Sequence, residues 1–412
     1  MSQRLGLNER RSLMTGHDAG ECSTDTEMPC PMNEACSASG RRPMTPAERR
    51  KEAQIRGSVG RRGFFKFLGL GTIGLGFGVS MFNTIFATSR VDGAEESAEE
   101  TKHRLIMIGT VDFMGFKARE ITPNEEFYIT TYSTVTPDID AGKHRLRVEG
   151  LVGEPSSFTM ADLEAMKDKR EFVTLQCIGN PIGGSAIGNA LWEGVTFRKV
   201  LESAHPGSGI VEAALFGEDG YSDSIPYKLV QSDDVFLAWR MNGDPLPKEH
   251  GYPLRLIVPG IYGMKNVKWI SKVELVNYDF KGFWEKQGWS DEAVIPLKSE
   301  ILMPMSGKSI PPGKYVVGGI AFGGRNGVTK VQVSLDGGKT WADGHVKPPL
   351  SKWSWSVWEY DWTPERKGDY RIAVRAVDRS GKVQESASLL GRITGSFPSG
   401  AKGIHQVDVT VM

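Results

Sequence analysis

Cysteine is scarce, and most of it lies outside the part of the chain that reads as folded. Cys22, Cys30 and Cys36 all precede residue 40, and only Cys177 lies further along. A disulfide framework in the folded body is therefore excluded. The seven histidines are scattered, and the chain contains no HExxH, CxxC or CxxCH motif. These absences exclude the common zinc sites and a covalently attached c-type haem.

Net charge is also lacking, because 50 Lys and Arg residues balance 50 Asp and Glu residues over 412 positions. Such a chain has no overall field that attracts nucleic acid or an anionic membrane, and no local basic patch replaces it, so we expect no nucleic-acid partner. The 39% of hydrophobic residues is typical of a globular protein, and the length predicts two domains. The 49 glycines favour turns over long helical bundles or coiled coils.

A weakly hydrophobic segment predicts a targeting signal. Arg61 and Arg62 come just before the run Phe64–Phe86, which carries one charge, Lys66. The run is long enough to cross a bilayer, but it contains five glycines and several Ser, Thr and Asn residues. A twin-arginine export signal over 61–89 therefore fits better than an uncleaved anchor of the same type or a chance buried helix. This signal predicts a periplasmic protein carried by the twin-arginine export machinery.

The segments on either side of this signal are polar. Residues 1–60 are charged and poor in aromatics, which predicts a disordered extension, and residues 90–104 form an acidic Ala/Glu/Ser linker. Cys22, Cys30 and Cys36 offer ligands for a metal or attachment points for a lipid, but a four-ligand site needs one more residue. An unstructured tail is the preferred interpretation of the extension.

Short strands and helices alternate over residues 105–303. Leu146 and Val148 give the period of a strand, and Thr159 with Asp162 three residues later predicts the start of a short helix. An apolar strand then ends at Cys177, where a glycine-rich loop begins. Helical spacing at 195–204 and further strands at 213–217, 235–239 and 253–258 complete the pattern. We therefore predict a mixed α+β domain.

From about residue 304 the pattern changes to period-two strands separated by turns, which predicts an all-β sandwich over 304–412. The Asp-Gly-Gly sequence after Leu335 predicts a hairpin turn. Five of the ten tryptophans fall between Trp341 and Trp362, and we expect them to fill the middle of the sandwich. This region has no convergent titratable cluster, so a structural or subunit-contact role is expected.

Two features of the first domain point to chemistry. A lone cysteine is most often a small buried hydrophobe, but Cys177 comes where a glycine-rich loop begins, so a metal ligand or a nucleophile is open. Arg255 lies between two leucines on an apolar strand, which is rare unless an anion meets the cation. His250, Arg255 and Lys268 lie within 19 residues and can form a cationic cup for a phosphate, although a solvated basic face is the alternative.

The segments LQCIGNPIGG, LWEGVTFRKVLE and MNGDPLPKEHGYPLRLIVPGIYGMKNVKWI resemble the sulfite oxidase family of molybdopterin-dependent oxidoreductases. The later segments VTKVQVSLDGGKTW and RAVDRSGKVQ resemble the immunoglobulin-like dimerisation domain of that family. The resemblance runs in order from Phe127 to the C-terminus. It implies an α+β fold with a mixed α/β molybdopterin core domain and an all-β immunoglobulin-like sandwich, a homodimer, and an enzyme that carries a molybdenum–molybdopterin cofactor.

The resemblance also implies roles for single residues. Cys177 matches the thiolate ligand of the molybdenum, a soft donor that suits this metal. The positions that match the family's cofactor-holding residues are Tyr128, Thr130, Thr131, Tyr132, His250, Arg255, Asn266, Val267 and Lys268. Folding around the cofactor before export also explains a twin-arginine signal.

Departures from the family pattern concern the substrate. Sulfite-oxidising members have Arg-Asn-His where this chain has Thr130–Tyr132, and an arginine where it has Ile182; their tyrosine before KGF is replaced by Phe280, two residues after Tyr278. Each lost charge-assisted hydrogen bond removes about 1.5 to 3 kcal/mol of binding free energy for a dianion. We therefore expect a neutral or organic substrate, such as a sulfoxide, an organosulfur compound or an aldehyde-like reductant. The expected catalytic set is Cys177, Thr130, Tyr132, Ile182 and Phe280.

The expected activity is oxygen-atom transfer on a small molecule. Because the chain has no haem motif, electrons must pass to or from a separate carrier, such as a cytochrome c or a membrane haem or quinone partner. Two alternatives remain. In one, the protein is a sulfite dehydrogenase in which Arg325 or Arg375 supplies the missing charge. In the other, it is a non-enzymatic binding module on the same scaffold.

Overall fold

The computed structural model describes residues 119–412. The predicted extension (1–60), export signal (61–89) and acidic linker (90–104), together with residues 105–118 of the predicted core domain, lie outside the described residues. Within 119–412, no helix has both the length and the apolar character needed to cross a membrane.

The first part of the described chain is built from short elements. In order these are β1 (Arg145–Gly150), β2 (Ser156–Thr159), α4 (Met160–Ala165), β3 (Lys169–Gln176), β4 (Ile187–Thr196), α5 (Phe197–Glu202), β5 (Glu212–Gly217), β6 (Ser222–Pro226), α6 (Tyr227–Val230), β7 (Phe236–Met241), β8 (Asp244–Pro245), η1 (Lys248–His250), β9 (Arg255–Ile257), η2 (Gly263–Lys265), β10 (Ile270–Val276) and α7 (Phe283–Lys286). The predicted α+β class is confirmed.

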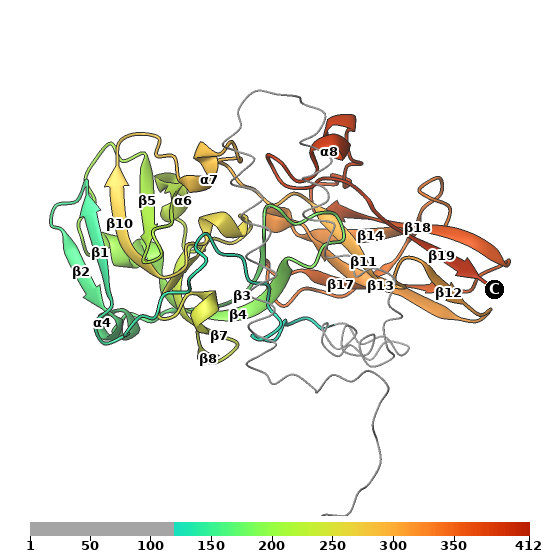
Figure 1. The fold of residues 1–412 in the computed structure, drawn as a ribbon, viewed down its shortest axis with the longest axis horizontal. Helices are drawn as coiled ribbons and strands as arrows, with labels where there is room; N and C mark the ends of the chain where they lie inside the picture. The colour runs from blue at the N-terminus through green and yellow to red at the C-terminus, as the bar shows by residue number, and fades with distance from the viewer. Residues whose placement is uncertain (1–118) are drawn as a thin grey trace, which may run out of the picture. The chain divides into compact units, whose positions relative to one another are not determined.

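These strands form two sheets. The first has the order β2-β1-β10-β5-β6, with β1 and β10 parallel and the other pairs antiparallel (Figure 1). The second has the order β3-β4-β7-β8, and β9 pairs with β7. Leu146 and Val148 are fully buried on β1, as their spacing predicts. The predicted helix start is also confirmed, because the Asp162 amide donates to Thr159 Oγ1 (3.1 Å) and the Thr159 amide donates to Asp162 Oδ2 (2.8 Å).

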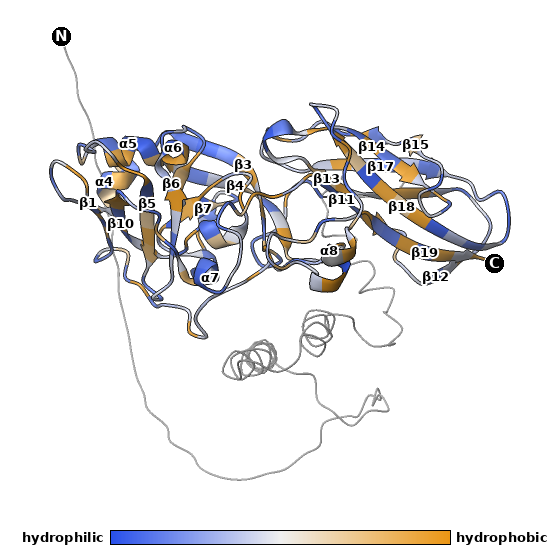
Figure 2. Cartoon of the chain, turned by 90° about the horizontal axis from the view of Figure 1, so that it is seen from above, coloured by the Kyte–Doolittle hydropathy of each residue, from blue (hydrophilic) through white to orange (hydrophobic). Residues whose placement is uncertain are grey.

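The remaining elements form the sandwich. They are β11 (Lys298–Met303), β12 (Lys308–Ile310), β13 (Tyr315–Phe322), η3 (Gly324–Asn326), β14 (Val328–Ser334), β15 (Ala342–Asp343), β16 (His345–Val346), β17 (Ser356–Trp362), β18 (Gly368–Asp378), α8 (Leu389–Thr394) and β19 (His405–Val411). One sheet has the order β11-β13-β17-β16 and the other β12-β19-β18-β14-β15. Hydrophobic and hydrophilic residues alternate along β18 and β19 (Figure 2), because one face of that sheet is buried. The strand β11 lies before the boundary predicted at residue 304 but pairs with β13.

The tryptophans of the second domain do not all fill its core, contrary to prediction. Trp358 and Trp362 pack in the sandwich, whereas Trp353 and Trp355 pack in the hydrophobic clusters of the first domain. Trp341 is half-buried, with its ring under the guanidinium of Arg375 at 4.2 Å. The sequence shows that these residues are apolar, but it does not show which domain buries them. The segment before β17 runs along the first domain, so its tryptophans are buried there.

That segment contacts β3, the strand that leads to Cys177. The Trp353 carbonyl accepts from the Thr174 amide (3.0 Å), and the Trp355 amide donates to Thr174 Oγ1 (2.9 Å). Ser351 Oγ donates to the Phe172 carbonyl (2.6 Å). The second domain thus helps to fix the strand at whose end the site lies.

Candidate active site

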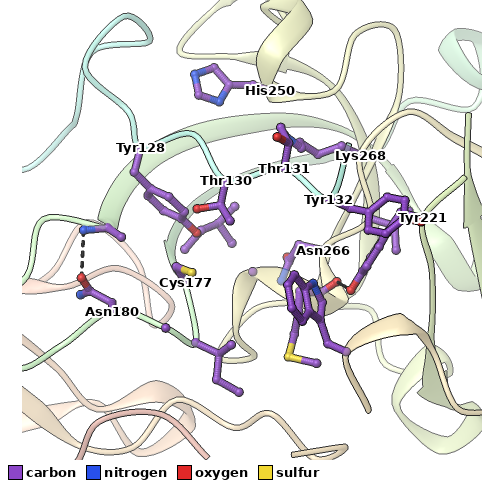
Figure 3. Close-up of a pocket in the computed structure, with 18 of the residues that line it drawn as sticks. Tyr128, Thr130, Thr131, Tyr132, Cys177, Asn180, Tyr221, His250, Asn266 and Lys268 are labelled. Carbon is purple, nitrogen blue, oxygen red and sulfur yellow. Dashed lines mark hydrogen bonds between the residues drawn. The ribbon is translucent and has the colours of Figure 1, made fainter. Parts of the chain in front are cut away.

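A cavity of about 320 Å³ opens at the end of β3 (Figure 3). Its size is that of a pocket for a cofactor or small molecule. Five separate segments line it, because loops from both sheets of the first domain meet there. These segments lie within residues 127–132, 175–186, 219–221, 250–269 and 284–289.

Cys177 is half-buried and lines the cavity (Figure 3). Its amide donates to the Ala186 carbonyl (3.0 Å), and the side chain of Asn180 closes the same loop by accepting from the Ala186 amide (3.0 Å) and donating to the Gly184 carbonyl (3.3 Å). Burial raises the pKa of the Cys177 thiol, while hydrogen bonds from the Gly179 backbone and the Thr130 side chain act in the opposite direction. A bound metal cation would favour the thiolate instead.

Arg255 is a buried cation that has no acidic partner among the described residues. It is 5% exposed, its Nη1 donates to the His250 carbonyl (2.8 Å) and its Nη2 donates to the Asn266 carbonyl (3.3 Å). Its Nε is buried and has no hydrogen-bond partner, and within residues 119–412 no carboxylate forms an ion pair with it. Burial lowers the pKa of Arg255 to about 10. A guanidinium in this state fits an anionic ligand that supplies the missing charge.

His250 ends η1 and is buried beside Arg255. Its Nε2 lies 3.0 Å from the Asn124 carbonyl, which can only accept, so Nε2 carries the proton and Nδ1 is left as an acceptor. Burial, and then the charge of Arg255, lower the pKa of His250 to about 4. His250 is therefore neutral at pH 7. The charges of the predicted cationic cup come from Arg255 and Lys268, whose Nζ donates to the Glu249 carbonyl (2.8 Å).

Asn266 lines the cavity, but the hydrogen bonds of its side chain go to backbone groups. Its Oδ1 accepts from the Val258 amide (2.7 Å), and its Nδ2 donates to the carbonyls of Ile261 (3.3 Å) and Tyr262 (3.0 Å). These bonds fix the loop after β9, so that the following residues, Val267 and Lys268, face the cavity. The contribution of Asn266 is to hold this loop.

The segment before β1 provides the other wall. Phe127 is buried and stacks on Tyr128 with ring centroids 5.4 Å apart. Burial raises the pKa of the Tyr128 phenol, the neighbouring Cys177 adds to this rise, and Arg255 opposes it. Thr130, Thr131 and Tyr132 continue along the same wall of the cavity (Figure 3).

Two predicted site residues do not line the cavity. Ile182 is 38% exposed and lies against Gly403, and the ring of Phe280 packs edge-on against Phe216 at 5.7 Å. Arg325 and Arg375, the alternative sources of charge, are not among the described lining residues either. Their guanidinium groups lie over Trp353 (5.5 Å) and Trp341 (4.2 Å). The position of Ile182 and Phe280 in a family motif was therefore not enough to place them in the cavity lining.

Sequence reasoning missed part of the lining. Tyr221 and Asp219 come from the turn between β5 and β6, Trp284 from α7, Met264 from η2, and Trp289 from the loop after α7. The ring of Tyr221 lies 5.9 Å from that of Tyr132. The sequence gives little signal for this turn, because the strand that follows it, Ser222–Pro226, has the mostly polar sequence SDSIP.

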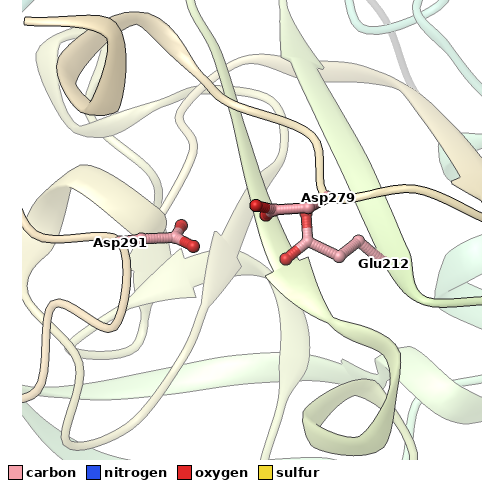
Figure 4. A group of neighbouring side chains, drawn as sticks. All are labelled: Glu212, Asp279 and Asp291. Carbon is pink, nitrogen blue, oxygen red and sulfur yellow. The ribbon is translucent and has the colours of Figure 1, made fainter.

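A group of three carboxylates lies elsewhere in this domain (Figure 4). The oxygens of Glu212, Asp279 and Asp291 lie within 4.8 Å of one another. Lys281 pairs with both Asp279 and Asp291 at 2.7 Å, and Glu212 accepts from the Phe280 amide at 3.0 Å. These contacts account for the group, so we assign no cation site to it.

Comparison with known proteins gives the family. Residues 133–284 match the oxidoreductase molybdopterin binding domain, and residues 291–409 match the Mo-co oxidoreductase dimerisation domain. Sulfite oxidase of Gallus gallus is 34% identical over 314 residues, which cover 65% of this chain and 68% of that protein. The chain belongs to the sulfite oxidase family of molybdopterin-dependent oxidoreductases.

Other members of the sulfite oxidase family match over a similar share of the chain. The mitochondrial sulfite oxidase of Homo sapiens is 32% identical over 64% of this chain, which spans 57% of the human protein. The crystal structure of the sulfane dehydrogenase SoxCD from Paracoccus pantotrophus aligns with a TM-score of 0.63 and 26% identity, covering 71% of this chain and 83% of that chain. The predicted core domain and sandwich are therefore those of this family.

The residues present fit the molybdenum cofactor of the family. Cys177 offers a soft sulfur donor in the cavity. Arg255 has a buried N–H without a partner, and Lys268 adds a second cation for the cofactor phosphate. The two elements of the site, a thiol and a cationic end, lie in one cavity of suitable volume.

Proposed function

We propose that this protein is an exported molybdenum-cofactor oxidoreductase that transfers an oxygen atom to or from a small, weakly charged sulfur compound. When bound, the cofactor supplies two-electron redox chemistry. The observation that carries the proposal is the cavity itself, which is lined together by Cys177, by the cations Arg255 and Lys268 and by several aromatic rings.

The residues have distinct roles in this proposal. Cys177 holds the metal. Arg255 and Lys268 hold the cofactor phosphate, and His250 offers the unprotonated Nδ1 as a hydrogen-bond acceptor. The backbone between Tyr128 and Tyr132, together with Val267 and the loop fixed by Asn266, encloses the pterin. Thr130 and Tyr132 face the substrate side.

The substrate end of the cavity supports a weakly charged molecule. Tyr132, Tyr221, Trp284, Trp289 and Met264 line it, and among the described lining residues Arg255 and Lys268 are the only Arg or Lys side chains. A dianion moved into this aromatic wall would lose its hydration without gaining further charged partners. A sulfoxide, another organosulfur compound or a sulfane sulfur would instead gain contact with the rings. The likeness to a sulfane dehydrogenase supports chemistry at sulfur.

Sulfite is the second candidate because the sequence relatives in Gallus gallus and Homo sapiens are sulfite oxidases. Arg325 and Arg375 do not line the cavity in this chain, and both guanidinium groups lie over tryptophan rings. Among the described lining residues, the cations that could bind sulfite are the two that we assign to the cofactor.

The partners and location complete the proposal. Electrons pass to or from a separate carrier, a cytochrome c or a membrane haem or quinone protein. The match to a dimerisation domain over residues 291–409 supports a homodimer. The Arg61-Arg62 pair and the weakly hydrophobic run after it support export to the periplasm by the twin-arginine route, with retention by the same segment as the alternative.

Metal analysis and a substrate panel test the proposal. We expect close to one molybdenum per purified chain, lost in Cys177→Ser and kept in Ser203→Ala, a change at an exposed residue outside the cavity lining. Assays with a redox dye should then show turnover of sulfoxides or sulfane compounds and poor turnover of sulfite. Fast turnover of sulfite with a low KM would contradict the substrate class, and a stable wild-type protein without metal would favour the binding module.

A further inference from the structure

Tyr221, on the cavity wall, has a hydroxyl group with two partners. It lies 2.7 Å from Asp223 Oδ2 and 3.0 Å from the Met264 carbonyl. A phenol has one proton and a carbonyl can only accept. Both contacts are hydrogen bonds only when the phenol donates to Met264 and the carboxyl of Asp223 donates to the phenol oxygen. The geometry therefore accommodates a proton on Asp223 as well as one on Tyr221.

Asp223 is fully buried on β6. Its Oδ1 accepts from the Ser224 amide (2.8 Å) and from Lys265 Nζ (2.9 Å), which leaves Oδ2 to face Tyr221. The pKa of Asp223 is raised to about 7, because the rise caused by burial and by the charge of Glu285 exceeds the lowering caused by Lys265 and by the contact with Tyr221. A carboxyl in this setting can take up and release a proton near neutral pH.

Lys265 connects Asp223 to the surface. Its ammonium is buried and also donates to Glu285 Oε1 (2.8 Å) and Asp291 Oδ1 (3.0 Å). Asp291 is 38% exposed at its side chain and pairs with Lys281. Among residues 119–412, Glu285 Oε2 is buried without a hydrogen-bond partner. Three carboxylates surround the single ammonium of Lys265, so negative charge around it is in excess. This excess favours one additional bound proton in the cluster.

We propose that Tyr221 and Asp223 carry protons between the cavity and the surface, and that Lys265 is the residue that positions Asp223 and links it to Asp291. Tyr221 exchanges a proton with the cavity and Asp223 with Tyr221. The Lys265 ammonium first gives a proton to Asp291, which is in contact with solvent, and its nitrogen lone pair then takes the proton of Asp223, so that Lys265 is an ammonium before and after the transfer. The groups that face this path are Asp219 beside Tyr221 in the turn before β6, Lys265 from η2, Glu285 from α7, and Asp291 and Lys281 from the flanking loops.

The path has a use in the proposed function, on which this inference rests. When water supplies the oxygen atom, a substrate becomes its oxide and two protons and two electrons are released. The electrons go to the separate carrier, and the protons leave through groups in the cavity wall. In the reverse direction the same groups deliver the protons that form water. Tyr221, Asp223 and Lys265 connect the cavity wall to Asp291 through a continuous chain of hydrogen bonds.

Asp223→Asn is the decisive variant, because its amide keeps the geometry but holds no exchangeable carboxyl proton. The Asn oxygen can accept from Lys265 and Ser224 while its NH₂ donates to Tyr221. In the holoenzyme we expect unchanged molybdenum content and KM, a fall in kcat of about 10²-fold, and partial rescue by added imidazole. Tyr221→Phe should lower kcat in the same way. Tyr278→Phe and Asp233→Asn change exposed residues outside the cavity lining and should leave kcat unchanged.

Infrared difference spectroscopy tests the carboxyl without turnover. A protonated-carboxyl band should titrate as the pH of the purified protein is raised from 5 to 9, and it should be missing in Asp223→Asn and kept in Asp233→Asn. The relay is wrong if no band titrates in this range, or if Asp223→Asn keeps the wild-type kcat and pH profile. If the band behaves as expected but no sulfur compound turns over, the proposed substrate class fails and the relay stands.

Discussion

The guanidinium of Arg255 lies 4.9 Å from the ring of Trp192, in a place where a buried cation would ordinarily have an acid beside it. Lys265, ten residues later, is buried against three carboxylates. One segment therefore carries two buried cations, one paired with carboxylates and one not. The charge of Lys265 is fully matched within the chain, whereas that of Arg255 is held by a π face and two carbonyl groups and is left for a ligand.

Arg255→Met should separate ligand binding from stability. The Met side chain keeps contact with Trp192 and removes a charge whose burial is unfavourable in the absence of an anion. We expect the cofactor-free protein to be as stable as wild type or more stable, and cofactor retention to fall by about tenfold or more. Thermal unfolding and molybdenum content measure the two effects. The exposed change Arg240→Met should alter neither, and a large loss of stability in Arg255→Met would show that the cation is structural.

His250 should make stability depend on acidity. Its folded pKa of about 4 lies below the unfolded value of 6.5, so the unfolded chain binds more protons between these limits. Stability is then fully present above pH 6.5 and falls as the pH drops through 4, by about 3 kcal/mol from this residue. Urea unfolding at a series of pH values should show the fall in wild type and a shallower one in His250→Gln. The exposed control His205→Asn should retain the wild-type slope.

Gly183→Ala should disturb the loop that follows Cys177. Gly183 has φ of +71°, and a Cβ there would lie 2.4 Å from His405 Nε2, whose ring is held by a 2.9 Å bond from the Ile301 amide to Nδ1. Gly209→Ala is a matched control, because φ is +74° and nothing lies within 4 Å. We expect Gly209→Ala to cost about 1 kcal/mol and Gly183→Ala to cost more and to lower molybdenum content. Equal effects of the two changes on both readouts would contradict the close approach.

Trp353→Ala should destabilise the first domain although its position lies in the second. The side chain is 2% exposed, packs with the cluster around Trp192, and donates from Nε1 to Asp234 (3.2 Å). Removing a buried tryptophan costs about 3 to 5 kcal/mol. Trp341→Ala, at a half-buried position, should cost much less. Urea unfolding measures the loss of unfolding free energy in each variant. Similar losses in the two variants would contradict the packing of Trp353 in the first domain.

Local patterns predicted much of the fold. The alternation at Leu146 and Val148 identified β1, and the spacing of Thr159 and Asp162 identified the capped start of α4, because both signals act over a few neighbouring residues. The longest strand of the first domain's second sheet, β4 (Ile187–Thr196), was not identified. Its glycine, asparagine and tryptophan residues give no clear period, because both of its faces are largely buried.

Site residues could be predicted from the sequence where the residue type and its neighbours along the chain are unusual by themselves. Cys177 and Arg255 stand out because a thiol beside a glycine-rich loop and a cation among leucines are unusual by themselves. Ile182 and Phe280 were selected by position in a motif, and neither is among the described residues that line the cavity. Tyr221 was missed because its importance comes from the residues opposite it, Met264 and Tyr132, which lie far away in sequence.

The sequence by itself determined the strands with clear periodicity, the helix cap and the presence of a thiol and of a cation on an apolar strand, Arg255, in the first domain. Only the tertiary structure decided which cation keeps its charge for a ligand. The reason is that pairing depends on residues brought together by packing: Asp223 on β6, Glu285 on α7 and Asp291 meet Lys265, whereas Trp192 on β4 meets Arg255. No local pattern records such encounters, because they are contacts between distant segments.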